Sequence, residues 1–142
     1  MNNDDVESKA DTRTNKRIIG DSGEDIVCTF LMKQGFKILD RNYLKPYGEL
    51  DIVGSKDGKY HFIEVKTVSC EMDSFVTRRT SDRYRPEDNV HAWKLRKLGR
   101  VIQAYLLHKK LFDADWQFDV ALVYLDSKTG KSVIEMLEDI IL

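Results

Sequence analysis

The sequence predicts an α/β fold in which one helix, three strands, a second helix and two strands build a central mixed sheet flanked by helices. Three observations predict it. Apolar residues repeat at helical spacing in two segments, one near residue 27 and one near residue 98. The pair Asp57-Gly58 lies between two segments of alternating apolar and polar residues, which is a strong hairpin signal. A strongly apolar segment at 116–125 has the length and composition of a buried strand.

Length and composition indicate one globular domain with a disordered tail. The chain has 142 residues, enough for one domain with a core and too few for two. Its 42% hydrophobic and 33% charged residues exclude a wholly disordered chain. Residues 1–17 are polar and show no apolar periodicity, so we expect a disordered N-terminal tail followed by a single domain over 18–142.

The first half of the domain is predicted as a helix followed by three strands. Val27, Phe30 and Leu31 fall on one helical face, and Gly35 ends the helix. The segment 36–41 is expected to form the first strand, and a turn follows around Pro46. The two arms of the hairpin then occupy the ranges 49–55 and 59–67.

The second half is predicted as a long loop, a helix and two strands. Residues 68–88 show little periodicity, and loops of this length in a compact domain are usually functional or disordered. A helix is expected over 89–110, with a buried face made of Leu98, Val101, Ile102 and Tyr105. Strands are expected over 116–125 and 133–137.

The hairpin places two carboxylates opposite each other. A symmetric loop centred between Asp57 and Gly58 pairs Asp51 with Glu64 and Glu49 with Lys66. Side chains alternate between the two faces of a strand, so these four residues share one face. The opposite face is then wholly apolar and is expected to lie under a helix; it consists of Leu50, Ile52, Ile63 and Val65.

Two facing carboxylates repel each other and need a compensating partner. At about 5 Å and an effective dielectric constant near 20, the repulsion is roughly 3 kcal/mol. One carboxyl group can stay protonated, Lys66 can compensate, or a divalent cation can bind. Carboxylates without histidine or cysteine suit hard ions such as Mg²⁺ or Mn²⁺. The alternative is a solvated sheet face with loose cross-strand ion pairs.

Positive charge is concentrated in one segment. The chain has a formal net charge of −1, yet residues 76–110 contain ten Lys and Arg against three acids, which leaves about −8 on the rest. Such a segment suits contacts with a phosphate backbone. Tyr84, between arginines, is a candidate for stacking on an unpaired base. The candidate phosphate contacts are Arg78, Arg79, Arg83, Arg85, Lys94 and Lys97. The alternative is a basic loop without a fixed role.

The ordered motifs resemble a known family. They are Gly23-Glu24, Arg41-Asn42, "GELD" at 48–51, "EVKT" at 64–67, Val90 with Lys94, and "FDV" at 118–120. In this order they resemble the YraN-like family of small endonuclease-like proteins, within the PD-(D/E)XK or restriction-endonuclease-like superfamily. The resemblance covers about residues 18–137. Leu50 replaces the proline of the superfamily motif, and Val68 stands where arginine is frequent.

The resemblance implies a fold, a site and an activity. The fold is a restriction-endonuclease-like αβββαβ core. Asp51 and Glu64 hold the metal with help from the Val65 carbonyl, Lys66 is the motif lysine, and Glu24 reaches the site from the first helix. The implied activity is that of a metal-dependent DNA endonuclease, acting on branched or single-stranded DNA in repair or recombination.

Two alternatives to a nuclease remain open, and a few residues carry expectations of their own. A non-catalytic nucleic-acid-binding module on the same fold, or an adaptor whose basic helix docks an acidic protein, would also fit the charge pattern.

Asp119 is expected to form a salt bridge with Arg96 or Arg100. The two cysteines have no metal-ligand spacing, so Cys28 and Cys70 are expected to be unpaired thiols in a reducing compartment. With no signal-peptide pattern or membrane-spanning segment, we expect a cytoplasmic protein.

Overall fold

A computed structural model of the chain describes residues 22–70, 92–126 and 128–142. It confirms the predicted order of one helix, three strands, one helix and two strands. The predicted tail, residues 1–17, lies outside the described residues. The elements are the N-terminal helix (residues 22–33), β1 (Lys37–Lys45), β2 (Gly48–Lys56), β3 (Lys59–Cys70), α4 (Ala92–His108), β4 (Asp115–Asp126) and β5 (Ser132–Leu137).

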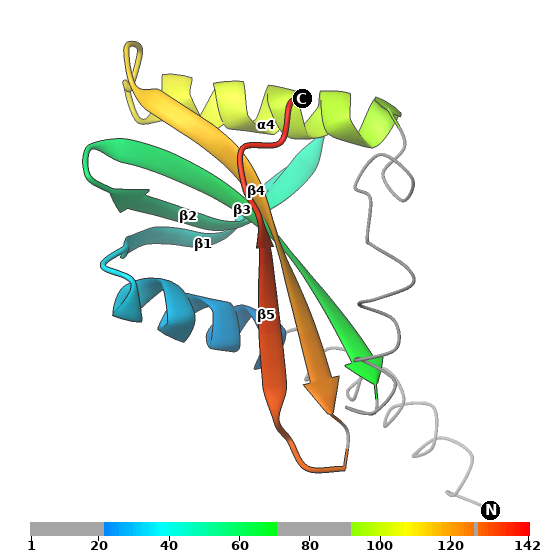
Figure 1. The fold of residues 1–142 in the computed structure, drawn as a ribbon. Helices are drawn as coiled ribbons and strands as arrows, with labels where there is room; N and C mark the ends of the chain where they lie inside the picture. Colours follow the sequence, from blue (N-terminus) through cyan, green and yellow to red (C-terminus); the bar gives the residue numbers. More distant parts are fainter. Residues whose placement is uncertain (1–21, 71–91, 127) are drawn as a thin grey trace, which may run out of the picture.

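The five strands form one mixed sheet in the order β1-β2-β3-β4-β5. All neighbouring strands are antiparallel except β3 and β4, which run parallel. The N-terminal helix and α4 lie on opposite faces of the sheet (Figure 1). This arrangement confirms the predicted α/β class with a central mixed sheet flanked by helices, and it is consistent with a restriction-endonuclease-like core. No helix within the described residues is long and apolar enough to cross a membrane.

The hydrophobic core is divided between the two faces of the sheet. On one face, Val27 and Leu31 of the N-terminal helix pack with Ile52 and Ile63 of the hairpin. On the other face, α4 contributes the buried side chains that its apolar periodicity predicted, namely Leu98, Val101, Ile102 and Tyr105. Both faces of the hairpin therefore pack against a helix.

The third strand is longer than predicted. We expected a loop from residue 68, but β3 continues to Cys70 because it pairs with β4 up to Cys70–Asp126. The remainder of the predicted loop, 71–88, lies outside the described residues. β1 also runs further than expected, to Lys45, because it pairs with β2 up to the turn at Pro46 and Tyr47.

The prediction that Leu50 shares a face with Ile52 is wrong. Leu50 is buried on the α4 side together with Val53, whereas Ile52 is buried under the N-terminal helix. The strand therefore changes face at Asp51. Asn42, on the neighbouring strand β1, has a left-handed backbone with φ of 52°, which breaks the regular alternation there as well. This local kink frees the Asp51 side chain from the regular pleat.

Gly23 allows the N-terminal helix to lie close against β3. A Cβ atom added at Gly23 would overlap Oγ1 of Thr67 and would lie 3.1 Å from its Cβ atom. The contact fixes the first turn of the helix, and with it Glu24, beside the strand that carries Glu64 and Lys66. The two family motifs "GE" and "EVKT" thus meet in space.

We expect Gly23→Ala to lower the free energy of unfolding by about 1–3 kcal/mol, because overpacking displaces the helix or Thr67. Chemical denaturation measures the change. Combining it with Thr67→Ala should recover part of the loss, as expected for residues in contact. The matched control is Gly99→Ala in α4, where an added Cβ meets no atom within 4 Å and the better helix propensity of alanine applies. A Gly23→Ala protein as stable as the Gly99→Ala protein would contradict the close approach.

Candidate functional site

Asp51 and Glu64 line the same pocket, between the β1–β2 turn and α4. The pocket has a volume of about 500 Å³. Its walls come from the turn on one side and from α4 on the other, where Lys97 contributes the cationic group. The lining residues are Leu44, Lys45, Pro46, Tyr47, Gly48, Glu49, Asp51, Glu64, Lys97, Leu98 and Val101.

Gly48 brings this turn against α4. A Cβ atom at Gly48 would lie 2.6 Å from Cγ2 of Val101, closer than side chains approach. The glycine of the "GELD" motif therefore closes one end of the pocket, and Glu49 and Asp51 follow it along β2.

The hairpin has the predicted register, but its pairing stops just before the two carboxylates. Residues pair from Lys56–Lys59 to Ile52–Ile63, as a symmetric Asp57-Gly58 loop requires. The next step would be Asp51–Glu64, and it is not among the paired residues. The ladder between β2 and β3 ends at Ile52–Ile63, so the predicted direct pairing of Asp51 with Glu64 is not formed.

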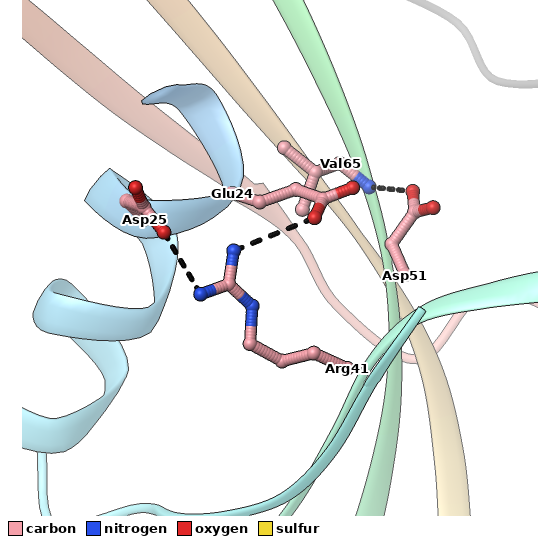
Figure 2. Close-up of polar contacts among 5 residues, drawn as sticks. All are labelled: Glu24, Asp25, Arg41, Asp51 and Val65. Atoms are coloured by element: carbon pink, nitrogen blue, oxygen red, sulfur yellow. Dashed lines mark hydrogen bonds and ion pairs between the residues drawn. The ribbon is translucent and has the colours of Figure 1, made fainter. Parts of the chain in front are cut away.

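The Asp51 carboxylate occupies the gap between the separated strands. Its Oδ2 atom accepts a hydrogen bond from the Val65 backbone N–H at 2.9 Å (Figure 2). In an unbroken ladder the Leu50 carbonyl would lie opposite this N–H. Because the N–H and C=O of a strand residue face the same neighbouring strand, the Val65 carbonyl faces the same gap. Asp51 and the Val65 main chain are thus adjacent, as the motif resemblance implies for metal ligands.

Burial and neighbouring negative charge act together on Asp51. The pKa of the Asp51 carboxyl group is raised to about 6, against an ordinary value of 3.8, and burial is the largest cause. The charges of Glu24, Glu64 and Glu49 contribute to this rise, and the Val65 hydrogen bond opposes it. Acidic side chains from the N-terminal helix, β2 and β3 therefore all act on the charge of the Asp51 carboxylate.

Arg41 holds Glu24 near the Asp51 carboxylate. Arg41 belongs to one of the sequence motifs, but the sequence predicts no role for it. Nη2 of Arg41 lies 3.5 Å from Glu24 Oε2, and Nη1 lies 2.8 Å from Asp25 Oδ1. The Glu24 side chain is only 14% exposed, and burial raises its pKa. Figure 2 shows it reaching from the helix toward the Asp51–Val65 contact. Its position suits the predicted further carboxylate.

Glu64 and Lys66 lie on the α4 side of the sheet. In the parallel ladder Glu64 pairs with Val120 and Lys66 with Leu122, and both partners belong to the core under α4. Both side chains are half-buried. The predicted sharing of a face by Glu64 and Lys66 is therefore confirmed, and α4 packs on that face.

The structure bears on only one of the predicted nucleic-acid contacts. Lys97 is exposed and lines the carboxylate pocket. Lys94 falls in the first turns of α4, and its side chain lies outside what the structure describes. The candidates in the predicted loop also lie outside the described residues; they are Arg78, Arg79, Arg83, Tyr84 and Arg85.

The donor set fits a hard divalent ion that keeps part of its water shell. Mg²⁺ usually takes one or two protein carboxylates and completes its shell with water and substrate phosphate. Asp51 and Glu64 line one pocket and supply those two groups. In the part of the chain that the structure describes, no three His, Cys, Asp or Glu side chains are placed to hold an ion, so a closed all-protein cage is not present there.

Asp119 does not bind Arg96 or Arg100, and that prediction is wrong. Its Oδ2 atom lies 2.9 Å from His61 Nδ1, and its Oδ1 atom accepts hydrogen bonds from Gln117 Nε2 at 2.7 Å and from the Asp139 backbone N–H at 2.9 Å. Asp119 is 1% exposed and lies on the face of the N-terminal helix, away from α4. Alternation along β4 separates Asp119 from Phe118 and Val120, but it did not tell which helix covers Asp119, and the buried His61 was not identified as its partner. Cys28 is a free, buried thiol, as expected.

The raised pKa of Asp51 makes the stability of the metal-free protein depend on pH. Between about pH 4 and pH 6 the folded state binds a proton that the unfolded state has lost, so stability falls as pH rises. The shift corresponds to roughly 3 kcal/mol once the pH exceeds 6. We expect Asp51→Asn to raise the free energy of unfolding at pH 8 by up to about 3 kcal/mol and to remove this decline. Denaturation without metal at pH 4 and pH 8 measures both effects.

Asp113→Asn is the control, because Asp113 is exposed between α4 and β4. It should leave the pH profile of stability unchanged. If Asp51→Asn shows the same decline between pH 4 and pH 6 as the unchanged protein, Asp51 is not the group that titrates there.

Comparison with known proteins gives a family without an assigned activity. The model of a family described as "Uncharacterised protein family UPF0102" matches residues 23–123. A UPF0102 protein of Dictyoglomus thermophilum is 38% identical over 82% of this chain and 90% of its own length. UPF0102 proteins of Helicobacter hepaticus and Campylobacter jejuni subsp. doylei are 37% and 36% identical over 70% and 83% of this chain, covering 79% and 88% of their own lengths. These matches confirm the family resemblance drawn from the motifs.

Proposed function

The chain belongs to the uncharacterised protein family UPF0102, and we propose that it is an Mg²⁺- or Mn²⁺-dependent DNA endonuclease that hydrolyses phosphodiester bonds. One observation carries this proposal. Asp51 and Glu64, from adjacent strands, line one pocket, and Lys66 follows Glu64 on the same face of β3. Two carboxylates beside a lysine provide metal ligands and a positioning cation at one place.

The charge of the pocket supports a requirement for metal. Its acidic lining residues, Glu49, Asp51 and Glu64, would repel a phosphate group. The pKa of Asp51 is raised first by burial and then by the charges of neighbouring acids, so a negative charge is unfavourable here. A divalent cation between Asp51 and Glu64 would relieve this repulsion and attract the phosphate.

The residues then divide the work of hydrolysis. Asp51, Glu64 and the Val65 carbonyl would hold the ion, which when bound lowers the pKa of its water and polarises the phosphate. Lys66 orients the attacking water or binds a phosphate oxygen, because it lies one strand step from Glu64. Glu24, fixed by Arg41, adds negative charge that strengthens cation binding. The hydrogen bond from Val65 N–H holds the Asp51 carboxylate in place.

Basic side chains at the pocket and elsewhere on α4 support a nucleic acid as the substrate. Lys97 lines the pocket, and Arg96 and Arg100 are exposed on the same helix. Cations at such positions bind phosphates regardless of base sequence. We therefore expect DNA recognition by structure, on branched or single-stranded substrates, more than by sequence.

A cleavage assay tests the proposal. End-labelled linear, single-stranded and branched DNAs are incubated with the full chain and millimolar Mg²⁺ or Mn²⁺, with and without a chelator. We expect cleavage that needs the metal and that Glu64→Gln abolishes, because this change removes a ligand charge and keeps the side-chain shape. Salt-sensitive binding without any cleavage would favour the non-catalytic nucleic-acid-binding module. Neither binding nor cleavage would favour the adaptor alternative.

A further inference from the structure

The end of β1 and the β1–β2 turn present two large apolar side chains at the wall of the carboxylate pocket. Leu44 is 72% exposed and Tyr47 is 42% exposed, and both line the pocket, with Lys45 and Pro46 between them in sequence. Single exposed apolar residues are ordinary on protein surfaces. Here an aliphatic and an aromatic side chain line the same pocket as the carboxylates of Asp51 and Glu64.

The turn is a rigid platform. Pro46 has a fixed φ, and Gly48 leaves no space between the turn and Val101 of α4. Behind it, the Tyr43 ring packs edge-to-face on Tyr105 with centroids 5.0 Å apart. A platform anchored in this way loses little conformational entropy when it binds a ligand.

Positive charge borders the same platform. The Lys45 ammonium lies 5.2 Å from the centroid of the Tyr43 ring, and Lys97 faces the pocket from α4. An apolar surface flanked by cations fits a nucleotide, whose base is flat and apolar on its faces and whose phosphate is anionic. A nucleotide whose phosphate enters the pocket can place its base against this turn, because the turn forms one wall of the pocket.

We propose that Tyr47 and Leu44 stack against an unpaired base next to the scissile phosphate, and that they select DNA with an unpaired nucleotide at that position. In a continuous duplex both faces of each base are covered by neighbouring base pairs, so the platform finds no surface to bind. In a single strand, flap or gap one face is open. The inference rests on the proposed nuclease function and assigns its substrate class to these two residues.

A fluorescent base tests the stacking without relying on cleavage. Oligonucleotides carry 2-aminopurine as the first unpaired nucleotide of a flap, or the same base inside a continuous duplex. The full chain with Glu64→Gln binds the flap at saturating concentration, so the strand stays intact. We expect Tyr47 to quench the fluorescence on the flap and not on the duplex. Tyr47→Ala should abolish the quenching, and Tyr47→Phe should keep it.

Measurements of binding and cleavage on flap and duplex DNA give the preference of the protein for an unpaired nucleotide. We expect Tyr47→Ala to reduce the preference for flap over duplex about 5- to 100-fold, the range that stacking one base provides, with a smaller loss for Leu44→Ala. Phe112→Ala is the matched control, because Phe112 is 71% exposed and does not line the pocket. An unchanged preference in Tyr47→Ala, or equal loss in Phe112→Ala, overturns the inference.

The outcomes also separate this inference from the proposed function. If metal-dependent cleavage and its preference for the flap are the same in Tyr47→Ala, the proposed nuclease function is supported and the stacking role of Tyr47 is wrong. If Tyr47 quenches the fluorescence but the wild-type protein cleaves no substrate, base stacking on Tyr47 is supported and the proposed nuclease function is wrong.

Discussion

Lys66→Ala is expected to slow metal-dependent DNA cleavage by about 10²- to 10⁴-fold, the range for a group that acts on the reacting atoms. Lys66 follows Glu64 on the α4-facing side of β3, and its neighbour across the parallel ladder is the buried Leu122. The substitution therefore removes a positive charge from the face of β3 that also carries Glu64. Single-turnover rates with saturating protein measure the loss.

Binding of DNA should survive the same substitution. One phosphate contact among several contributes little to a distributed electrostatic interaction, so the affinity of Lys66→Ala should remain close to that of the unchanged protein. Lys131→Ala is the control, because Lys131 is exposed next to β5 and is not among the residues lining the pocket. Cleavage by Lys66→Ala at the original rate would assign the activity to another site or to a contaminant.

The hairpin explains how much of this site the sequence could predict. The pair Asp57-Gly58, whose residues both have positive φ, specifies a tight turn, and the turn specifies the register from Lys56–Lys59 to Ile52–Ile63. Register is a local property, so it follows from the residues near the turn. The pattern of buried residues on α4 could be predicted for the same reason, since its period is that of one helix.

The end of the hairpin could not be predicted, because it depends on a neighbouring strand. Asn42 adopts its left-handed backbone in β1, and β2 changes face opposite to it at Asp51. Nothing within the β2 sequence marks this kink. The result is that the Asp51 carboxylate enters the gap between strands and binds Val65 N–H instead of standing on the sheet face.

The hydrogen-bond partner of Asp119 could not be predicted for a related reason. Alternation along β4 correctly separates Asp119 from Phe118 and Val120, but it does not tell which helix covers each face. His61 lies 58 positions earlier in the chain and becomes a neighbour only when β3 and β4 pair in parallel, with His61 beside Gln117. Contacts across a parallel crossover carry no signal in the local sequence pattern.

Asp119→Ala is expected to lower the free energy of unfolding by about 3–5 kcal/mol, since it breaks a buried polar pair and leaves its partners without an acceptor. Asp119 connects three parts of the fold, namely His61 on β3, Gln117 on β4 and the backbone at Asp139 after β5. Thermal or chemical denaturation measures the loss, which should exceed that of any other single substitution proposed above.

The controls for Asp119 distinguish a structural role from a catalytic one. Asp115→Ala, on an exposed position of the same strand, should leave stability within about 0.5 kcal/mol. Asp119→Asn keeps an acceptor oxygen and should lose less than Asp119→Ala. Because His61 and Asp119 line a different pocket from Asp51 and Glu64, the folded fraction of either variant should cleave DNA at the original rate. A folded Asp119→Asn protein that has lost cleavage would place the His61–Asp119 pair in the chemistry, and the assignment of that chemistry to the Asp51–Glu64 pocket alone would be wrong.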